Sequence, residues 1–233
     1  MSELLHFSEH TLQEAALVIM AIVYTLRIRW LFSFKGSRER QAPTGAPDTT
    51  PRKGIIYSWA AIAMPWTMES TRTKKIFYAQ FIIFHIGVTL AILLSFIIPY
   101  APSLLADNPL LITILQVFIG AAFVVGCIRL IRRITNVYVR AISSPDDYFS
   151  VILLTVWFAF AFFAVPNQYQ QGEAVLITYF FLTAFFLIYV PFSKISHYLY
   201  YPFARYWFGK TMGYRGVYPI RRVVKKGGVE YGK

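Results

Sequence analysis

His85 is the one side chain that titrates near neutral pH in a long apolar stretch of this chain. Residues 76–99 read IFYAQFIIFHIGVTLAILLSFIIP and contain no Asp, Glu, Lys or Arg. At roughly 1.5 Å per residue, a helix of this length is long enough to cross the hydrocarbon core of a bilayer. Because a titratable group in hydrocarbon costs free energy unless something binds it, His85 indicates a functional site.

The other histidines are His6, His10 and His197, so a partner for His85 must come from these three. His197 lies toward the inner end of another apolar stretch, AVLITYFFLTAFFLIYVPFSKISHYLYY, which begins at Ala174. The two stretches are expected to run in opposite directions, which places His85 and His197 at similar depth in the inner half of the membrane. His6 and His10 lie at the outer end of the first apolar stretch, either as ligands of an outward-facing site or in a solvated tail.

Two neutral imidazoles at matching depth on facing helices suit the two axial positions of a haem b iron. Iron binding would also offset the cost of burying both rings. The alternative is that each histidine is a hydrogen-bonded core residue. Zinc is disfavoured because a third and fourth nitrogen, sulfur or carboxylate ligand are missing. Lys194, one turn before His197, is placed to pair with a haem propionate, or else is an interfacial lysine whose ammonium reaches the headgroups.

Composition indicates a membrane protein. Of the 233 residues, 57% are hydrophobic and 15% are charged, against about 25% charged in soluble domains. The single cysteine, Cys127, excludes an internal disulfide, a thiolate-held iron–sulfur cluster and a covalent haem site of the C-x-x-C-H type. The predicted fold is an all-α bundle of five transmembrane helices, at residues 15–34, 76–99, 110–128, 148–165 and 174–201.

Basic residues are confined to alternate connections between these helices. All 23 Lys and Arg fall in residues 27–75, 129–140 and 194–233, while the other connections carry none. This distribution follows the positive-inside rule, so we expect the N-terminus outside and the C-terminus in the cytoplasm. The net charge of +12 therefore reflects topology and a cytoplasmic surface, and we expect no nucleic-acid partner.

Two features of the connections bear on the domain organisation. Residues 35–75 begin with an irregular Pro- and Gly-rich part and continue with an apolar, aromatic part that carries Trp59 and Trp66. That second part either lies along the membrane interface or is a docking surface for another subunit. We expect one membrane domain over residues 1–200, including this connection, and a basic, aromatic cytoplasmic tail over residues 201–233.

The remaining local signals concern helix packing and helix starts. Ala122 and Gly126 form a small-xxx-small pair, which indicates either close helix packing or a groove for a flat cofactor. In the sequence SSPDD, Ser144 is the expected N-cap of the fourth span and Pro145 its first helical residue. The acids that follow, at positions 146 and 147, are expected to interact with the helix dipole rather than to catalyse.

Two motifs give the chain a family resemblance. FHIG at residues 84–87, PFSKISH at residues 191–197 and the basic loop IRRITNVYVRAISSPDD are similar to those of the membrane-embedded gamma subunit of respiratory nitrate reductase. The wider family of five-helix b-type cytochromes includes the membrane subunits of heterodisulfide reductase and of sulfate-reducer redox complexes. The resemblance implies that His85 and His197 ligate the haem nearest the cytoplasm. Ser95 and Tyr179 stand where the family ligates a second, outer haem, so we expect a single haem.

The resemblance also implies a role. A haem b membrane anchor would relay electrons between a quinone, with menaquinone favoured, and a cytoplasmic iron–sulfur subunit in a prokaryotic cytoplasmic membrane. A periplasmic cytochrome c or another membrane subunit is a further possible partner. Because the sequence shows no nucleophile, acid–base pair or phosphate-binding loop, the chain is expected to be a non-catalytic or quinone-reacting subunit of an oxidoreductase complex. The alternative is a cofactor-free membrane scaffold or small transporter subunit with packing histidines.

Overall fold

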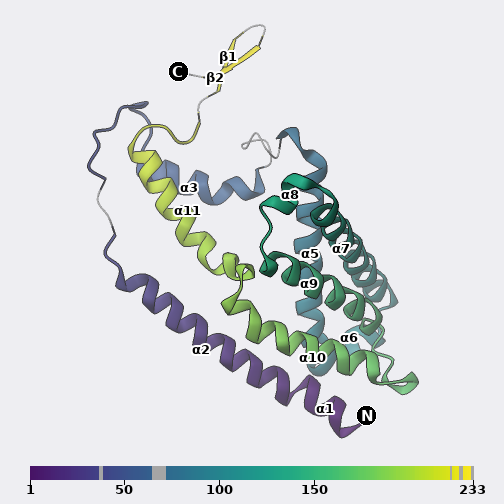
Figure 1. Cartoon of the computed structure of the whole chain (residues 1–233). Coiled ribbons are helices and arrows are strands. Elements are labelled where there is room, and N and C mark those ends of the chain that lie inside the picture. Colours follow the sequence, from purple (N-terminus) through teal and green to yellow (C-terminus); the bar gives the residue numbers. More distant parts are fainter. Residues whose placement is uncertain (37–38, 65–71, 221, 226–227, 232–233) are drawn as a thin grey trace. The chain divides into compact units, whose positions relative to one another are not determined.

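The described part of the chain consists mainly of helices, and a long irregular connection separates α2 (Thr11–Ser33) from α3 (Pro51–Ala60) (Figure 1). The computed structural model describes residues 1–36, 39–64, 72–220, 222–225 and 228–231. Five segments are long and apolar enough to cross a membrane, which confirms the predicted multi-pass, five-helix membrane fold. They are α1 (Glu3–Glu9) with α2 (Thr11–Ser33), α5 (Lys75–Tyr100), α7 (Pro109–Thr135), α9 (Pro145–Ala164), and α10 (Ala174–Tyr189) with η3 (Val190–Phe192).

Shorter elements connect these spans or follow them. The helical ones are α3 (Pro51–Ala60), η1 (Ala61–Ala63), α6 (Ser103–Ala106), α8 (Val137–Ala141), η2 (Tyr169–Gln171), η4 (Lys194–Ser196) and α11 (His197–Tyr214). A short antiparallel hairpin, β1 (Arg222–Lys225) and β2 (Gly228–Tyr231), follows α11 and places Arg222 opposite Tyr231. Apart from this hairpin, the regular structure of the described residues is helical.

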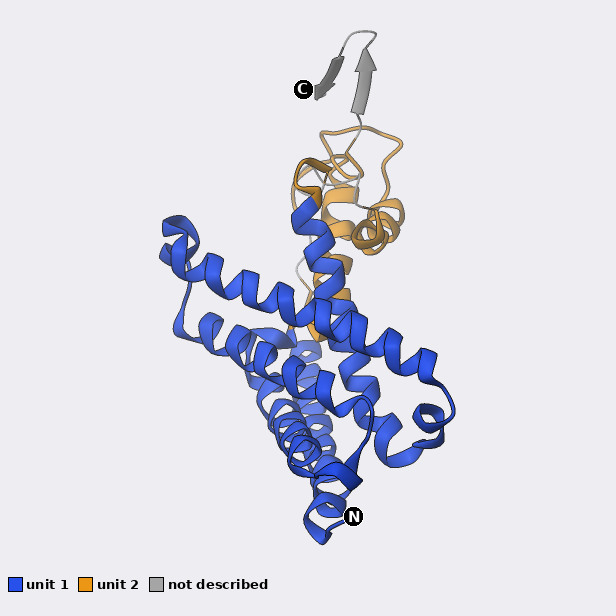
Figure 2. Ribbon diagram, turned by 90° about the vertical axis from the view of Figure 1, so that its right-hand side faces the viewer, with its two compact units in different colours: residues 1–33, 76–196 blue, residues 34–75, 197–233 orange. Residues whose placement is uncertain are grey.

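The chain divides into two compact units, shown in different colours in Figure 2. Unit 1 holds residues 1–33 and 76–196, and unit 2 holds residues 34–75 and 197–233. The sequence grouped the connection 35–75 with the membrane helices. In the structure this connection belongs to unit 2 because α3 packs on α11.

The core of unit 1 forms where the apolar helices meet. α7 packs on α9, and α10 packs on both α9 and α2. Gly87 on α5 makes close packing on α7 possible, since a Cβ atom built on it would lie only 2.2 Å from the Cβ of Ala122. Gly126 has the same role farther along α7, where a Cβ would meet the hydroxyl of Thr155 on α9. Helix packing therefore accounts for the small-xxx-small pair, and no cofactor groove is needed to explain it.

The start of α9 confirms the predicted helix start. Ser144 is the N-cap, and Pro145 is the first helical residue. The Asp147 carboxylate accepts hydrogen bonds from both the backbone N–H and the hydroxyl of Ser144, each at 2.8 Å. A carboxylate in the first turn also interacts favourably with the partial positive charge of the helix N-terminus.

The fifth span ends earlier than the sequence indicated, and the prediction of one helix continuing to residue 201 is wrong. α10 stops at Tyr189 because Pro191 has no N–H to continue the hydrogen-bond ladder and Ser193 is extended, with φ −102° and ψ 172°. Ser193 then starts the next turn, since its hydroxyl accepts a hydrogen bond from the Ile195 N–H at 3.2 Å. His197 is consequently the first residue of a separate helix, α11.

Unit 2 is built on a close crossing of α3 and α11. A Cβ at Gly54 would lie 2.1 Å from the carbonyl oxygen of Gly209, so only glycine allows this backbone approach. The guanidinium of Arg205 donates to the carbonyl oxygen of Ser58 at 3.0 Å. The indole N–H of Trp59 donates to the carbonyl oxygen of Pro202 at 2.9 Å. The second tryptophan of this connection, Trp66, lies outside the described residues.

Candidate functional site

The His85 ring is half-buried and follows the buried Phe84 on α5, about 100° farther round the helix than that residue. Its Nδ1 is 2.7 Å from the carbonyl oxygen of Phe81, which can only accept a hydrogen bond. In a neutral imidazole, Nδ1 therefore carries the hydrogen. Metal-ligating histidines use this arrangement, because the hydrogen bond fixes both the tautomer and the ring orientation.

His197 lies in a different setting. It is exposed, begins α11 and belongs to unit 2, whereas His85 belongs to unit 1. The structure assigns each predicted ligand to an element but does not bring the two into one unit. Their pairing across a haem stays a prediction.

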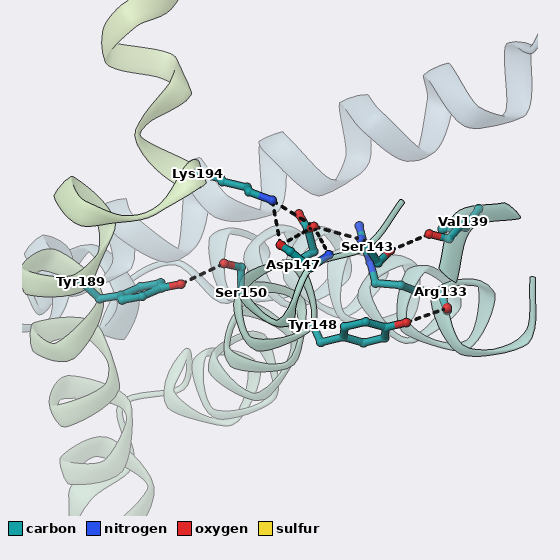
Figure 3. A network of polar contacts seen from close by, with 9 residues as sticks. Arg133, Val139, Ser143, Asp147, Tyr148, Ser150, Tyr189 and Lys194 are labelled. Carbon is teal, nitrogen blue, oxygen red and sulfur yellow. Dashed lines mark hydrogen bonds and ion pairs between the residues drawn. The ribbon is translucent and has the colours of Figure 1, made fainter. Parts of the chain in front are cut away.

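Lys194 belongs to a polar network in unit 1 that is centred on Asp147 (Figure 3). Its ammonium donates to Asp147 Oδ2 at 3.0 Å and to the Ser144 hydroxyl at 2.8 Å. Arg133 approaches the same carboxylate oxygen at 3.9 Å. The predicted contact of Lys194 with a haem propionate is untested, and such a contact would compete with Asp147.

Contacts in and around the same network join the end of α7, the start of α9 and the end of α10. Arg133 on α7 donates to the Ser143 hydroxyl at 2.7 Å, and the hydroxyl of Tyr148 donates to the Arg133 carbonyl oxygen at 3.2 Å. On α10, the hydroxyl of Tyr189 donates to an Asp146 oxygen at 2.6 Å (Ser150 is a further neighbour of this hydroxyl in Figure 3). These acids are held by partners in the bundle, which agrees with a structural rather than a catalytic role.

Tyr179 occupies one of the two positions at which the family that the sequence resembles would hold an outer haem. It is fully buried, and its hydroxyl donates to the carbonyl oxygen of Ala91 on α5 at 2.5 Å. The indole N–H of Trp157 donates to the Thr183 hydroxyl at 2.8 Å, and this hydroxyl donates to the Tyr179 carbonyl oxygen at 2.7 Å. Ser95, at the other position, donates to its own helix at Ile92. Side chains of α9 and α10 thus pack closely around Tyr179.

Sequence reasoning did not single out Trp157 and Thr183 in this cluster. A weak signal was present, since Tyr179 and Thr183 are polar residues four apart in an apolar span and therefore share one helix face. Trp157 on α9 gave no comparable signal, because a tryptophan in a membrane span is equally compatible with a lipid-facing position.

A multi-ligand metal centre and a b-type haem need different numbers of protein ligands. Across those residues, no group of three or more His, Cys, Asp or Glu side chains could hold a metal ion. A b-type haem iron needs only two protein ligands, which a pair of imidazoles can provide. The rings of His6 and His10 lie 4.8 Å apart near the N-terminus, where His10 Nε2 is 3.6 Å from a Glu9 carboxylate oxygen.

Comparisons with models of known protein families, with curated proteins and with solved structures found no match to this chain. The family resemblance therefore remains a prediction that rests on the two histidine motifs and the basic loop.

Proposed function

We propose that this chain is a haem b membrane subunit that relays electrons between a quinone and a cytoplasmic iron–sulfur partner. In this proposal, His85 and His197 hold the iron, and the chain anchors its partner at a prokaryotic cytoplasmic membrane. The observation that carries the proposal is the half-buried His85 imidazole, whose Nδ1 hydrogen is given to the Phe81 carbonyl oxygen at 2.7 Å. When bound, a b-type haem supplies one-electron transfer at a potential set by its ligands and surroundings.

The residues around His85 would set those surroundings. The Phe81 ring lies 4.2 Å from the imidazole between centroids, and the Phe84 ring lies 6.2 Å away at 70°. These aromatic side chains exclude water from one side of the ligand. A dry, apolar environment of this kind is one means by which a protein tunes a redox potential.

Unit 2 offers features suited to docking the soluble partner. Trp59 and Trp207 are exposed, and the Lys210 ammonium lies 4.9 Å above the Trp207 ring. Tryptophan is enriched at protein interfaces relative to the rest of the protein surface. The family resemblance supplies the class of partner, an iron–sulfur subunit.

A visible absorption spectrum tests the proposal. Protein purified after haem-supplemented expression should show the Soret band of low-spin haem b, at one haem per chain. His85→Ala and His197→Ala should each abolish that low-spin spectrum, while the matched control His10→Ala should keep it. A wild-type preparation without a Soret band would refute the haem function. Two haems per chain would show that Ser95 and Tyr179 do not exclude an outer site.

A cofactor-free scaffold or small transporter subunit is the second candidate. The same contact favours it, because the hydrogen bond to the Phe81 carbonyl oxygen and the packing on the Phe81 ring would also satisfy a core histidine without iron. In that case the wild type would show no Soret band, and His85→Ala would lower only the free energy of unfolding.

A further inference from the structure

Two arginines of α7 lie over two phenylalanines of α5. The guanidinium carbon of Arg129 is 4.2 Å from the centre of the Phe84 ring, and that of Arg132 is 4.5 Å from the Phe77 ring. The arginines are three residues apart and the phenylalanines seven, so each pair shares one face of its helix. The four residues therefore form one cationic face, which we call the arginine face, across the adjoining ends of α5 and α7.

The arginine face has no acidic partner among the described residues. The nearby Asp147 carboxylate is engaged by Lys194 at 3.0 Å and by Arg133 at 3.9 Å. Neither Arg129 nor Arg132 makes a hydrogen bond or ion pair with another described residue. Each guanidinium offers five N–H donors, and two like charges one turn apart on a helix repel each other. An anion that bridges them would satisfy the donors and remove this repulsion.

The surroundings of the arginine face indicate what kind of anion it takes. Arg129 is half-buried within the α7 span, about 9 Å before the helix ends at Thr135. Neighbouring apolar side chains are exposed, with Phe77 47% and Ile128, one turn before Arg132, 41% accessible. A ligand must therefore carry negative charge at one end and cover apolar surface with the rest, as a phospholipid does.

We propose that the arginine face binds the phosphate of an anionic phospholipid. Arg129 and Arg132 donate to the phosphate oxygens, and the acyl chains cover the exposed side chains of Phe77 and Ile128. The positive-inside charge distribution assigns these helix ends to the cytoplasmic leaflet, where basic pockets between transmembrane helices bind anionic headgroups. Arginine suits the role because its planar fork matches phosphate and stacks on aromatic rings. This site does not depend on the proposed haem function.

Lipid binding by the full-length protein tests the proposal. Delipidated protein in detergent is titrated with phosphatidylglycerol or phosphatidylcholine and followed by native mass spectrometry. Phosphatidylglycerol should bind the wild type more tightly than phosphatidylcholine. At roughly 1 kcal/mol for each basic residue near the surface, Arg129→Gln with Arg132→Gln should weaken its binding about 30-fold. The control Arg140→Gln, which removes the same charge from an exposed position on α8, should change it little.

A charge-preserving variant and a competitor sharpen the test. A double lysine variant at positions 129 and 132 keeps the charge and should bind phosphatidylglycerol with intermediate affinity, and it serves if the glutamine variant does not fold. Inorganic phosphate that displaces the lipid fully at low concentration would mean that the site takes free phosphate, which overturns the proposal. Equal losses in the Arg140→Gln control, or equal affinity for phosphatidylcholine, would also overturn it. So would a glutamine variant that loses bound haem but retains the lipid.

Discussion

The hydroxyl of Tyr179 donates a hydrogen bond to the backbone carbonyl oxygen of Ala91, joining the middle of α10 to the middle of α5 at 2.5 Å. The tyrosine is fully buried, so water cannot replace this contact. A polar link between apolar spans fixes their relative depth, because sliding either helix by one turn would leave the hydroxyl without this partner.

Tyr179→Phe removes the hydroxyl and keeps the ring. We expect the free energy of unfolding to fall by about 0.5 to 2 kcal/mol, the range for hydrogen bonds between membrane helices. Unfolding in a mixed detergent titrated with sodium dodecyl sulfate measures the change. Tyr100→Phe is the matched control, since its hydroxyl binds Glu14 at an exposed position and should matter far less. Equal losses in the two variants would show that the Ala91 contact contributes nothing particular.

Gly87→Ala should force α5 and α7 apart. The new methyl group would lie 2.2 Å from the Ala122 Cβ, whereas carbon atoms in contact prefer about 3.5 to 4.0 Å. We expect a loss of about 1 to 3 kcal/mol in the free energy of unfolding, typical of overpacking. Ala122→Gly in the same chain should restore much of it, and a double-mutant cycle measures the coupling. Gly120→Ala, whose Cβ would lie 3.3 Å from the Phe162 ring, should be milder.

Substitutions of Asp147 and Lys194 separate a helix cap from an ion pair. Asp147→Ala removes the acceptor of both Ser144 hydrogen bonds, and losing a cap costs about 1 kcal/mol. Lys194→Gln removes the ion pair with Asp147 and the ammonium's hydrogen bond to Ser144, and because this lysine is 61% exposed the loss should be about 0.5 kcal/mol at most. Chemical denaturation should therefore show the larger loss for Asp147→Ala. Equal losses would mean that the ion pair accounts for the whole effect.

Glu39 gives unit 2 a pH dependence. The backbone N–H of Gln41 and the guanidinium of Arg215, 2.8 Å away, favour its charged form and lower its pKa. A carboxylate with a lowered folded-state pKa stabilises the fold above its ordinary pKa, and this stabilisation is lost as the pH falls through the lowered value. Wild-type unit 2 should therefore be better protected from hydrogen exchange than Glu39→Gln at neutral pH. The difference should vanish on strong acidification, and a constant difference would contradict the assignment.

The sequence predicted the five spans well because each is a long apolar run, and hydrocarbon forces such a run to satisfy its backbone as a helix. The start of α9 was equally predictable from the sequence, because its capping contacts all lie within one turn, at Ser144, Pro145 and Asp147. Unit 2 was not foreseen. The contact of Gly54 with Gly209 joins residues far apart in the chain, and no local pattern marks such a pairing.

Only part of the candidate site could be predicted from the sequence. His85 stood out because it is a titratable residue in an apolar run, and its hydrogen bond to Phe81 is local. The sequence shows how many cations α7 carries. It does not predict that the Arg129 guanidinium lies over the Phe84 ring, because that ring belongs to another helix. Pro191 was visible too, yet the sequence did not show whether it bends the helix or ends it.

The extended residue Ser193 interrupts the helix between α10 and His197, so a rotation of α10 about its axis is not transmitted directly to the His197 imidazole. Along an unbroken helix, every residue turns by about 100° relative to the last, so any roll of α10 would swing a distant imidazole with it. Two short 3₁₀ helices, η3 and η4, stand in place of a continuous α-helix between Tyr189 and His197. Substitutions that alter the packing of α10 are therefore not expected to redirect the His197 imidazole. The orientation of that ring depends instead on the packing of α11 on α3, at the close approach of Gly54 and Gly209.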